Sequence, residues 1–90
     1  MKNRFESRVK ACQRYLKRAT ITWRDYPVNN TLENYHRKLQ LHRRVLLAEL
    51  LLLRALGMKH AMRETRRGIE LQTMNLQEVK VAIQERRGAL

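Results

Sequence analysis

The chain has 90 residues, with 20 Lys or Arg against 8 Asp or Glu, and its net charge is +12. This length predicts one domain, 1–90, and a single cysteine, Cys12, excludes an internal disulfide framework. The longest apolar-rich stretch, 45–56, is interrupted by Glu49 and Arg54 and is too short and too charged to span a membrane. We therefore expect a soluble, cytoplasmic protein with an acidic partner rather than a membrane partner.

Residues 2–24 form the first predicted helix. Its apolar residues recur at steps of four and three: Phe5, Val9, Cys12, Leu16, Ala19 and Trp23. Such a stripe gives the helix one face for packing. The opposite side is basic and carries Lys10, Arg14, Lys17 and Arg18. Pro27 lacks an amide hydrogen and restricts the residue before it, so a turn over 25–30 ends this helix.

The second predicted helix covers about 31–56. Asn30, followed by Glu33 three residues later, resembles a capping box at its start. Its first half is basic and contains His36, Arg37, Lys38, Arg43 and Arg44. Its second half is apolar on almost every side, and its candidate partner or oligomer surface consists of Leu46, Leu47, Leu50, Leu51 and Leu53. The alternative is that these leucines are buried by neighbouring helices of the same chain.

The third helical region covers about 58–87. Gly57, in a left-handed conformation, can end the helix before it. A 4-3 repeat indicates coiled-coil-like packing and runs through Met58, Met62, Thr65, Ile69, Gln72, Leu76, Val79, Ile83, Arg86 and Leu90. Gly68 resembles a helix end, so the sequence leaves two alternatives: one continuous helix, or two helices with a break near 68–75.

These elements predict an all-α protein. Helices of similar length favour a three-helix antiparallel bundle. A helical hairpin with a long third helix is the alternative architecture. The chain contains only 3 Gly and 1 Pro, which leaves little room for additional turns.

No pattern of residues indicates catalysis. His36, His42 and His60 lack a second His or a Cys at ligand spacing on one helix face, so we expect no metal site. Cys12 lies in an apolar stripe and is expected to be a small packing residue. The carboxylates are scattered singly, so we expect no enzyme and no cofactor. Glu49 is expected to pair with a basic residue of another helix or of a partner.

The basic residues and the leucine-rich segment together predict the function. Arginine outnumbers lysine, which suits bidentate contacts with carboxylates or phosphates. We expect a small adaptor, inhibitor or regulator that docks on a larger protein or nucleoprotein complex, with apolar contacts for affinity and basic residues for orientation. The alternative is a nucleic-acid-binding protein whose basic helices contact an RNA or DNA backbone.

Aromatic residues cluster in the sequence around Pro27. Trp23 and Tyr26 are candidate anchors for a partner, because Trp and Tyr are common at interface hot spots. The alternative is a small hydrophobic knot that Trp23 and Tyr26 form with Tyr15 and Tyr35.

Overall fold

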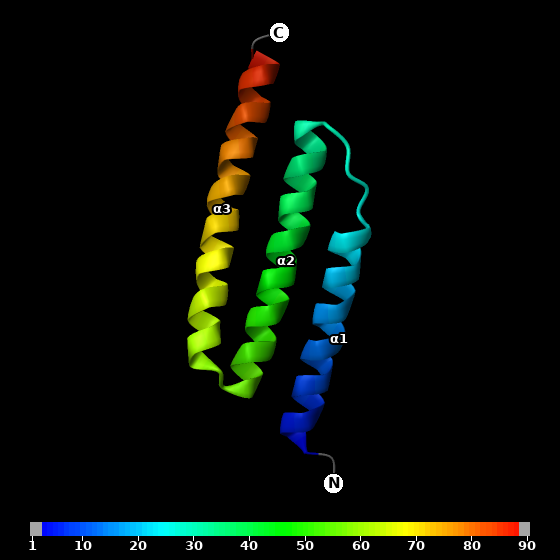
Figure 1. Cartoon of the computed structure of the whole chain (residues 1–90), viewed down its shortest axis with the longest axis vertical. Coiled ribbons are helices and arrows are strands. Elements are labelled where there is room, and N and C mark those ends of the chain that lie inside the picture. Colours follow the sequence, from blue (N-terminus) through cyan, green and yellow to red (C-terminus); the bar gives the residue numbers. More distant parts are fainter. Residues whose placement is uncertain (1–2, 89–90) are drawn as a thin grey trace.

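The computed structural model describes residues 3–88, which form three long helices (Figure 1). They are α1 (Arg4–Asp25), α2 (Leu32–Leu56) and α3 (Lys59–Gly88), and no strand occurs within 3–88. The chain runs up, down and up through them, so the predicted all-α fold with three antiparallel helices is confirmed. Within this range, none of the helices combines the length and hydropathy required to cross a bilayer.

Local interactions explain where α1 begins and ends. The side-chain oxygen of Asn3 accepts a hydrogen bond from the Phe5 amide at 2.9 Å and satisfies one of the free donors of the first turn. The helix ends at Asp25, and Tyr26 takes extended angles of φ −67° and ψ 125° immediately before Pro27. The predicted end at Pro27 is therefore confirmed.

The start of α2 differs from the predicted Asn30–Glu33 capping box, which is wrong. Thr31 is the N-cap, and its hydroxyl oxygen accepts a hydrogen bond from the Asn34 amide at 3.1 Å. The reason lies in the loop, where Asn29 accepts hydrogen bonds from both the amide and the hydroxyl of Thr31 and so orients that residue.

Asn34 also fixes the loop between α1 and α2. It is buried, its side-chain nitrogen donates to the Pro27 carbonyl at 2.8 Å, and its side-chain oxygen accepts from the Asn29 amide at 3.1 Å. Both polar atoms of a buried amide are thereby satisfied. This arrangement determines how the chain returns from α1 into α2.

Gly57 ends α2 in the predicted way. Its φ of 71° and ψ of 24° place it in the left-handed region, which favours glycine. The Met58 amide donates to the Leu53 carbonyl at 3.0 Å, and the Gly57 amide donates to the Arg54 carbonyl at 3.1 Å. These bonds satisfy carbonyls that the helix end would otherwise leave free.

The alternative of a break near 68–75 is wrong, because α3 continues through this segment as one helix of 30 residues. Gly68 instead lies beside α2. A Cβ placed on Gly68 would lie 3.4 Å from Leu46 Cδ1, which is an ordinary van der Waals contact. Gly68 is therefore an ordinary helical position beside Leu46, although it resembles a helix end in the sequence.

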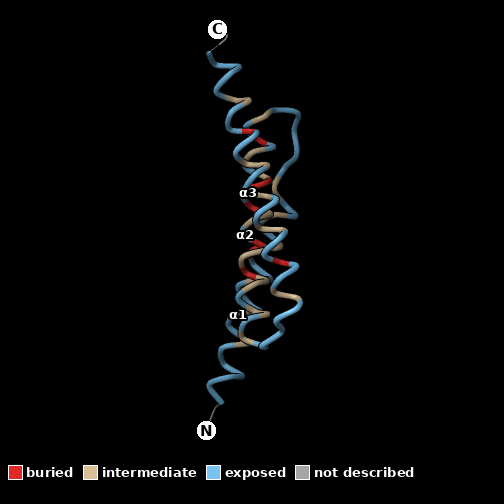
Figure 2. The backbone as a smooth tube through the Cα atoms, turned by 90° about the vertical axis from the view of Figure 1, so that its left-hand side faces the viewer, coloured by how far each residue is buried: buried red, intermediate tan, exposed pale blue. Residues whose placement is uncertain are grey.

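The three helices form an open layer rather than a closed bundle. Central α2 packs against both α1 and α3, whereas α1 and α3 do not contact each other within residues 3–88. The molecule extends 63 × 25 × 14 Å, and its radius of gyration is 16.3 Å, compared with about 12 Å for a compact domain of this length. Figure 2 shows the layer from its edge, where the helices overlap.

The core is correspondingly small. Between α1 and α2 it consists of Ala19, Val45 and Ala48, with Leu16 and Trp23 packed beside them. Alanines on facing helices permit close approach of the two backbones. Because no fourth helix covers the layer within the described chain, both broad faces of α2 remain available for side chains with other roles.

Candidate functional site

One broad face of the layer contains a groove of about 770 Å³ that crosses all three helices. Its lining includes α2 residues from His36 to Leu47 and α3 residues from Thr73 to Arg87, and Tyr15 contributes from α1. The open layer creates this groove, because α2 lies between helices that do not meet above it.

The groove is strongly cationic. Five basic side chains line it, and its lining contains no Asp or Glu: Arg37, Arg43, Arg44, Lys80 and Arg87. Within residues 3–88, the ion pairs involve other cations, so these five have no carboxylate partner there. A concave surface with charge of one sign raises the local concentration of an oppositely charged ligand.

Neutral groups hold two of the groove arginines. Arg43 donates from Nε to the Thr73 hydroxyl at 2.9 Å, and Arg37 donates from Nη1 to Gln40 Oε1 at 3.3 Å. These bonds orient the guanidinium groups without neutralising them. The remaining N–H donors of each guanidinium group stay available for a carboxylate or phosphate.

Apolar side chains lie among the cations. Leu47 of α2 and Leu76 and Ile83 of α3 line the groove together with the Tyr15 ring. Leu51 follows Leu47 by about one helical turn, so it continues the same side of α2, and it is 50% exposed. The groove therefore combines an apolar strip with basic side chains.

The predicted basic residues lie on different surfaces. Arg37, Arg43 and Arg44 line the groove, and Arg18 reaches its margin, where it shares a smaller hollow with Arg44. Lys38 has a structural contact: its ammonium donates to the Trp23 carbonyl and, at 3.2 Å, to the Tyr26 carbonyl. It thereby binds the C-terminal end of α1.

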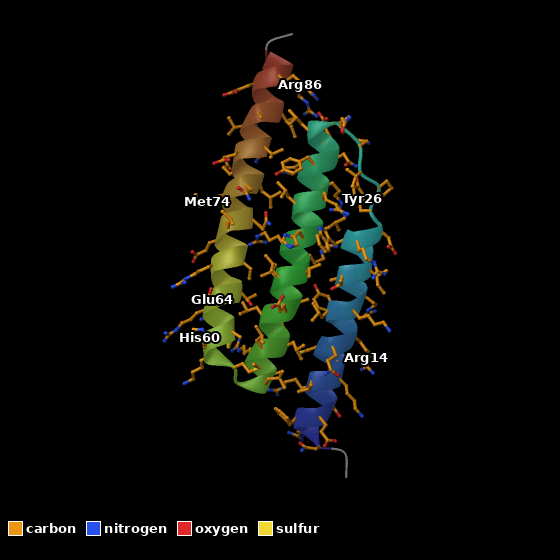
Figure 3. The ribbon with its side chains drawn as sticks, in the orientation of Figure 1. Arg14, Tyr26, His60, Glu64, Met74 and Arg86 are labelled. Carbon is orange, nitrogen blue, oxygen red and sulfur yellow. The ribbon has the colours of Figure 1, made fainter. Side chains whose placement is uncertain are left out.

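Three predicted basic residues of α1 lie outside the groove. Lys10, Arg14 and Lys17 are exposed, and they lie about half a helical turn from the side of α1 that packs on α2. Figure 3 shows Arg14 on this outer side. They form an edge of the layer that is separate from the groove.

Sequence reasoning missed the contribution of α3. Lys80 and Arg87 are seven residues apart and so lie on one side of the helix, where they face the groove beside Ile83. Their spacing was the available signal. The two residues lie far in the sequence from the basic cluster at 36–44, so proximity along the chain does not group them with it.

The five predicted leucines have different surroundings. Leu46 contacts Gly68 of α3, and Leu47 lines the groove. Leu50 and Leu53 are partly buried, and Leu51 is exposed. The part of this surface that is open to a partner is therefore centred on Leu47 and Leu51.

The aromatic residues near Pro27 do not form the expected knot. Trp23 packs instead on His42, with ring centroids 4.9 Å apart, and the Lys38 ammonium lies 5.5 Å from its ring centroid. Tyr15 and Tyr35 are exposed. Trp23 and Tyr26 are both partly buried, and their role as partner anchors stays a prediction.

Polar contacts within the layer lie on the face opposite the groove, because His42 and Glu49 are about half a helical turn from Leu47, which lines the groove. His42 Nδ1 and Gln72 Nε2 lie 2.7 Å apart, and Asn75 donates to Gln72 Oε1 at 3.3 Å. Glu49 accepts a hydrogen bond from the Thr65 hydroxyl at 3.4 Å. The expected pairing of Glu49 with a basic residue of another helix is wrong for residues 3–88, because the buried Thr65 occupies the facing position on α3.

An ion pair joins the start of α2 to the end of α3. Arg86 Nη2 lies 2.6 Å from Glu33 Oε1, at the end of the layer where α2 begins (Figure 3). A backbone hydrogen bond at Glu33 and then the Arg86 hydrogen bond lower the pKa of the Glu33 carboxyl. Both groups are substantially exposed, so solvent screens their attraction.

Other candidate chemical groups are dispersed. Cys12 is a free, partly buried cysteine in the apolar stripe of α1. Within the described chain, no three His, Cys, Asp or Glu side chains come together as a metal site would require.

Comparisons with known proteins found no relative. No protein-family model, curated protein or solved structure matches this chain.

Proposed function

We propose that this protein is a non-enzymatic helical adaptor or regulator that docks on an acidic segment of a larger protein or nucleoprotein complex. One observation supports this proposal above the others: a groove over the central helix combines five basic side chains with an apolar strip and contains no carboxylate. Because no described part of the chain compensates these charges, their natural counterpart is an anionic partner.

The chemistry of the groove favours an acidic amphipathic helix as the docking segment. Its apolar residues would contact Leu47, Leu76 and Ile83, and its carboxylates would meet cations at both sides of the groove. Arg44 stands on the α1 side, where it shares a hollow with Tyr15, and Lys80 belongs to α3. A stripe of apolar residues with acidic flanks is complementary to this arrangement.

The dimensions are also suitable. The groove residues of α3 extend from Thr73 to Arg87, a rise of about 21 Å, which corresponds to about four turns of a docked helix. Packed helices have axes about 8–10 Å apart, so α1 and α3 leave about 16–20 Å between their axes above α2. A helix with a diameter of about 10 Å fits this space.

Each part of the groove has its own energetic role. Full burial of an exposed leucine side chain contributes about 1.5–3 kcal/mol, and Leu51, one turn beyond the groove-lining Leu47, has half of its surface available. The guanidinium groups of the arginines add directional hydrogen bonds with carboxylates. Apolar contact would therefore supply much of the affinity, and the cations would speed association and fix orientation.

A nucleic-acid backbone is the second candidate partner. The observation that favours it is the set of neutral and cationic donors in the groove, where Gln40, Gln77 and Gln84 stand beside the arginines. Phosphate contacts make binding strongly salt-dependent, with a slope of about −0.9 in log affinity per contact on duplex DNA. An interface with an apolar strip should lose much less affinity in high salt.

A pull-down from native-like lysate with the tagged protein distinguishes these partners. The groove variant carries Arg43→Glu and Lys80→Glu, and the matched control carries Lys10→Glu and Arg14→Glu on the outer side of α1. We expect the wild type and the control to retain a protein after nuclease treatment and high salt, and the groove variant to lose it. Retention by the groove variant would contradict the proposal, and nuclease-sensitive recovery of nucleic acid would favour the second candidate.

A further inference from the structure

The outer side of α3 carries an apolar stripe that the chain leaves uncovered. Leu71 is 56% exposed, Met74 is 61% exposed and Val81 is 39% exposed. These residues follow the spacing of a heptad repeat on the side of α3 away from Leu76, which faces the groove. Figure 3 labels Met74 on this helix, at one long edge of the layer.

Acidic residues accompany this stripe. Glu70, Glu78 and Glu85 are exposed, and the single cation between residues 70 and 85, Lys80, faces the groove. This edge is thus locally acidic and apolar, although the protein has a net charge of +12.

The opposite edge of the layer has the complementary charge. Exposed residues on the outer side of α1 also follow a spacing of three and four: Lys10, Arg14, Lys17 and Ile21. Ile21 supplies an apolar contact, and the carbon chains of Lys and Arg can cover further apolar surface. Both edges extend over about three helical turns, so they match in length.

We propose that the α3 edge of one copy packs against the α1 edge of a second copy and extends the layer sideways. Pairing of α3 with α3 would bring Glu70, Glu78 and Glu85 of both copies together. Pairing of α1 with α1 would do the same for its cations. The α3–α1 contact alone places the acids opposite Lys10, Arg14 and Lys17, which identifies a second copy as the partner that fits.

This contact is heterologous, because it joins two different surfaces. Each dimer therefore keeps one free α3 edge and one free α1 edge, and assembly continues beyond the dimer until the edges close into a ring or the protein is depleted. The groove lies on a broad face, so the edge contact leaves it open. The inference is independent of the proposed partner of the groove.

Sedimentation velocity with two complementary variants tests the contact. The first carries Lys10→Glu, Arg14→Glu and Lys17→Glu and keeps only its α3 edge. The second carries Leu71→Lys and Met74→Lys and keeps only its α1 edge. We expect the wild type to form species larger than dimers as concentration rises, and each variant alone to associate at least about tenfold more weakly, as loss of about 1.4 kcal/mol implies.

An equimolar mixture of the two variants gives the decisive result. We expect a one-to-one dimer that grows no further, because each variant supplies the edge that the other lacks. A triple reversal in the groove, Arg43→Glu, Lys80→Glu and Arg87→Glu, changes the net charge as much as the first variant. It should self-associate like the wild type.

Several results would overturn the proposal. They are a wild type that stays monomeric at all concentrations, self-association that stops at dimers and survives the α1 reversals, and a mixture that forms no dimer. Circular dichroism checks that the variants remain helical. If Leu71→Lys with Met74→Lys loses helix, Leu71→Gln with Met74→Gln replaces it, and the same outcomes apply.

Discussion

The two broad faces of the layer use similar side chains in opposite ways. On the groove face, Lys80 and Arg44 line an open surface without a carboxylate. On the other face, the Lys38 ammonium is bound by carbonyls of α1, and His42 contacts Gln72 of α3. The groove face also connects two helices, through Arg43 and Thr73, but its other cations are not bound in this way, whereas the Lys38 ammonium is held by two carbonyls. Basic residues of one helix therefore have different roles, which depend on the face that each occupies.

Substitution of a side chain that is buried inside the layer should have the largest effect on stability. Leu41 is 2% exposed and is the largest fully buried side chain among residues 3–88. We expect Leu41→Ala to lower the free energy of unfolding by about 2–5 kcal/mol, because it removes buried surface and leaves a cavity. Thermal and denaturant unfolding measure this change. Leu51→Ala, at an exposed position one helical turn beyond the groove, is the control and should cost less than about 1.5 kcal/mol.

Two lysine substitutions measure how differently the two faces contribute to stability. We expect Lys38→Met to lower the free energy of unfolding by about 1–2 kcal/mol, because it removes the hydrogen bonds from the ammonium to the Trp23 and Tyr26 carbonyls. Lys80→Met should change it by less than about 0.5 kcal/mol. Denaturant titration compares the two variants directly. Equal losses would contradict the division of roles between the faces.

Gly68→Ala tests the packing of α3 against Leu46 of α2. Alanine favours a helix interior by about 1 kcal/mol over glycine, and the new Cβ would meet Leu46 at ordinary contact distance, 3.4 Å. We expect a gain in the free energy of unfolding of about 0.5–1 kcal/mol, measured by denaturant titration. A loss of more than about 1 kcal/mol would mean that Leu46 cannot adjust.

The smallest expected effect concerns pH. The pKa of Glu33 is lowered in the folded protein, first by its backbone hydrogen bond and then by Arg86. Its stabilising contribution is therefore present above the ordinary pKa of 4.5 and is lost as the pH falls through the lower folded value. Unfolding of the wild type and of Glu33→Gln, measured from pH 7 to pH 3, should converge at the acidic end. A constant difference would contradict this assignment.

The sequence predicted the helices better than their arrangement. The apolar stripe of α1, Pro27 and Gly57 determine helix faces and ends locally, so their effects could be anticipated. The continuity of α3 through Gly68 could not, because a glycine at this place in the sequence is compatible with a helix interior and with a helix end. The open layer also depends on which helices pack together, and the same stripes are compatible with a closed bundle.

The groove could be predicted only in part, because some of its residues are neighbours in the sequence and others meet only through helix packing. Arg37, Arg43 and Arg44 are neighbours in the sequence and on α2, so their cluster was visible. Lys80 and Arg87 join them only through the packing of α3 on α2. Conversely, Lys38 belongs to the same stretch of sequence but lies near α1 carbonyls, and no local pattern distinguishes it from Arg37.

Binding of a defined acidic helix tests whether the groove is a docking site for an acidic amphipathic segment. The probe is a fluorescent synthetic peptide of about 15 residues, with leucines on one helical face and glutamates on its flanks, and a scrambled peptide of the same composition is the control. We expect saturable binding of the amphipathic peptide, at least about tenfold weaker for the Arg43→Glu/Lys80→Glu variant and unchanged for Lys10→Glu/Arg14→Glu. Equal binding by the wild type and the groove variant, or equal binding of the scrambled peptide, would contradict a groove built for an acidic amphipathic helix.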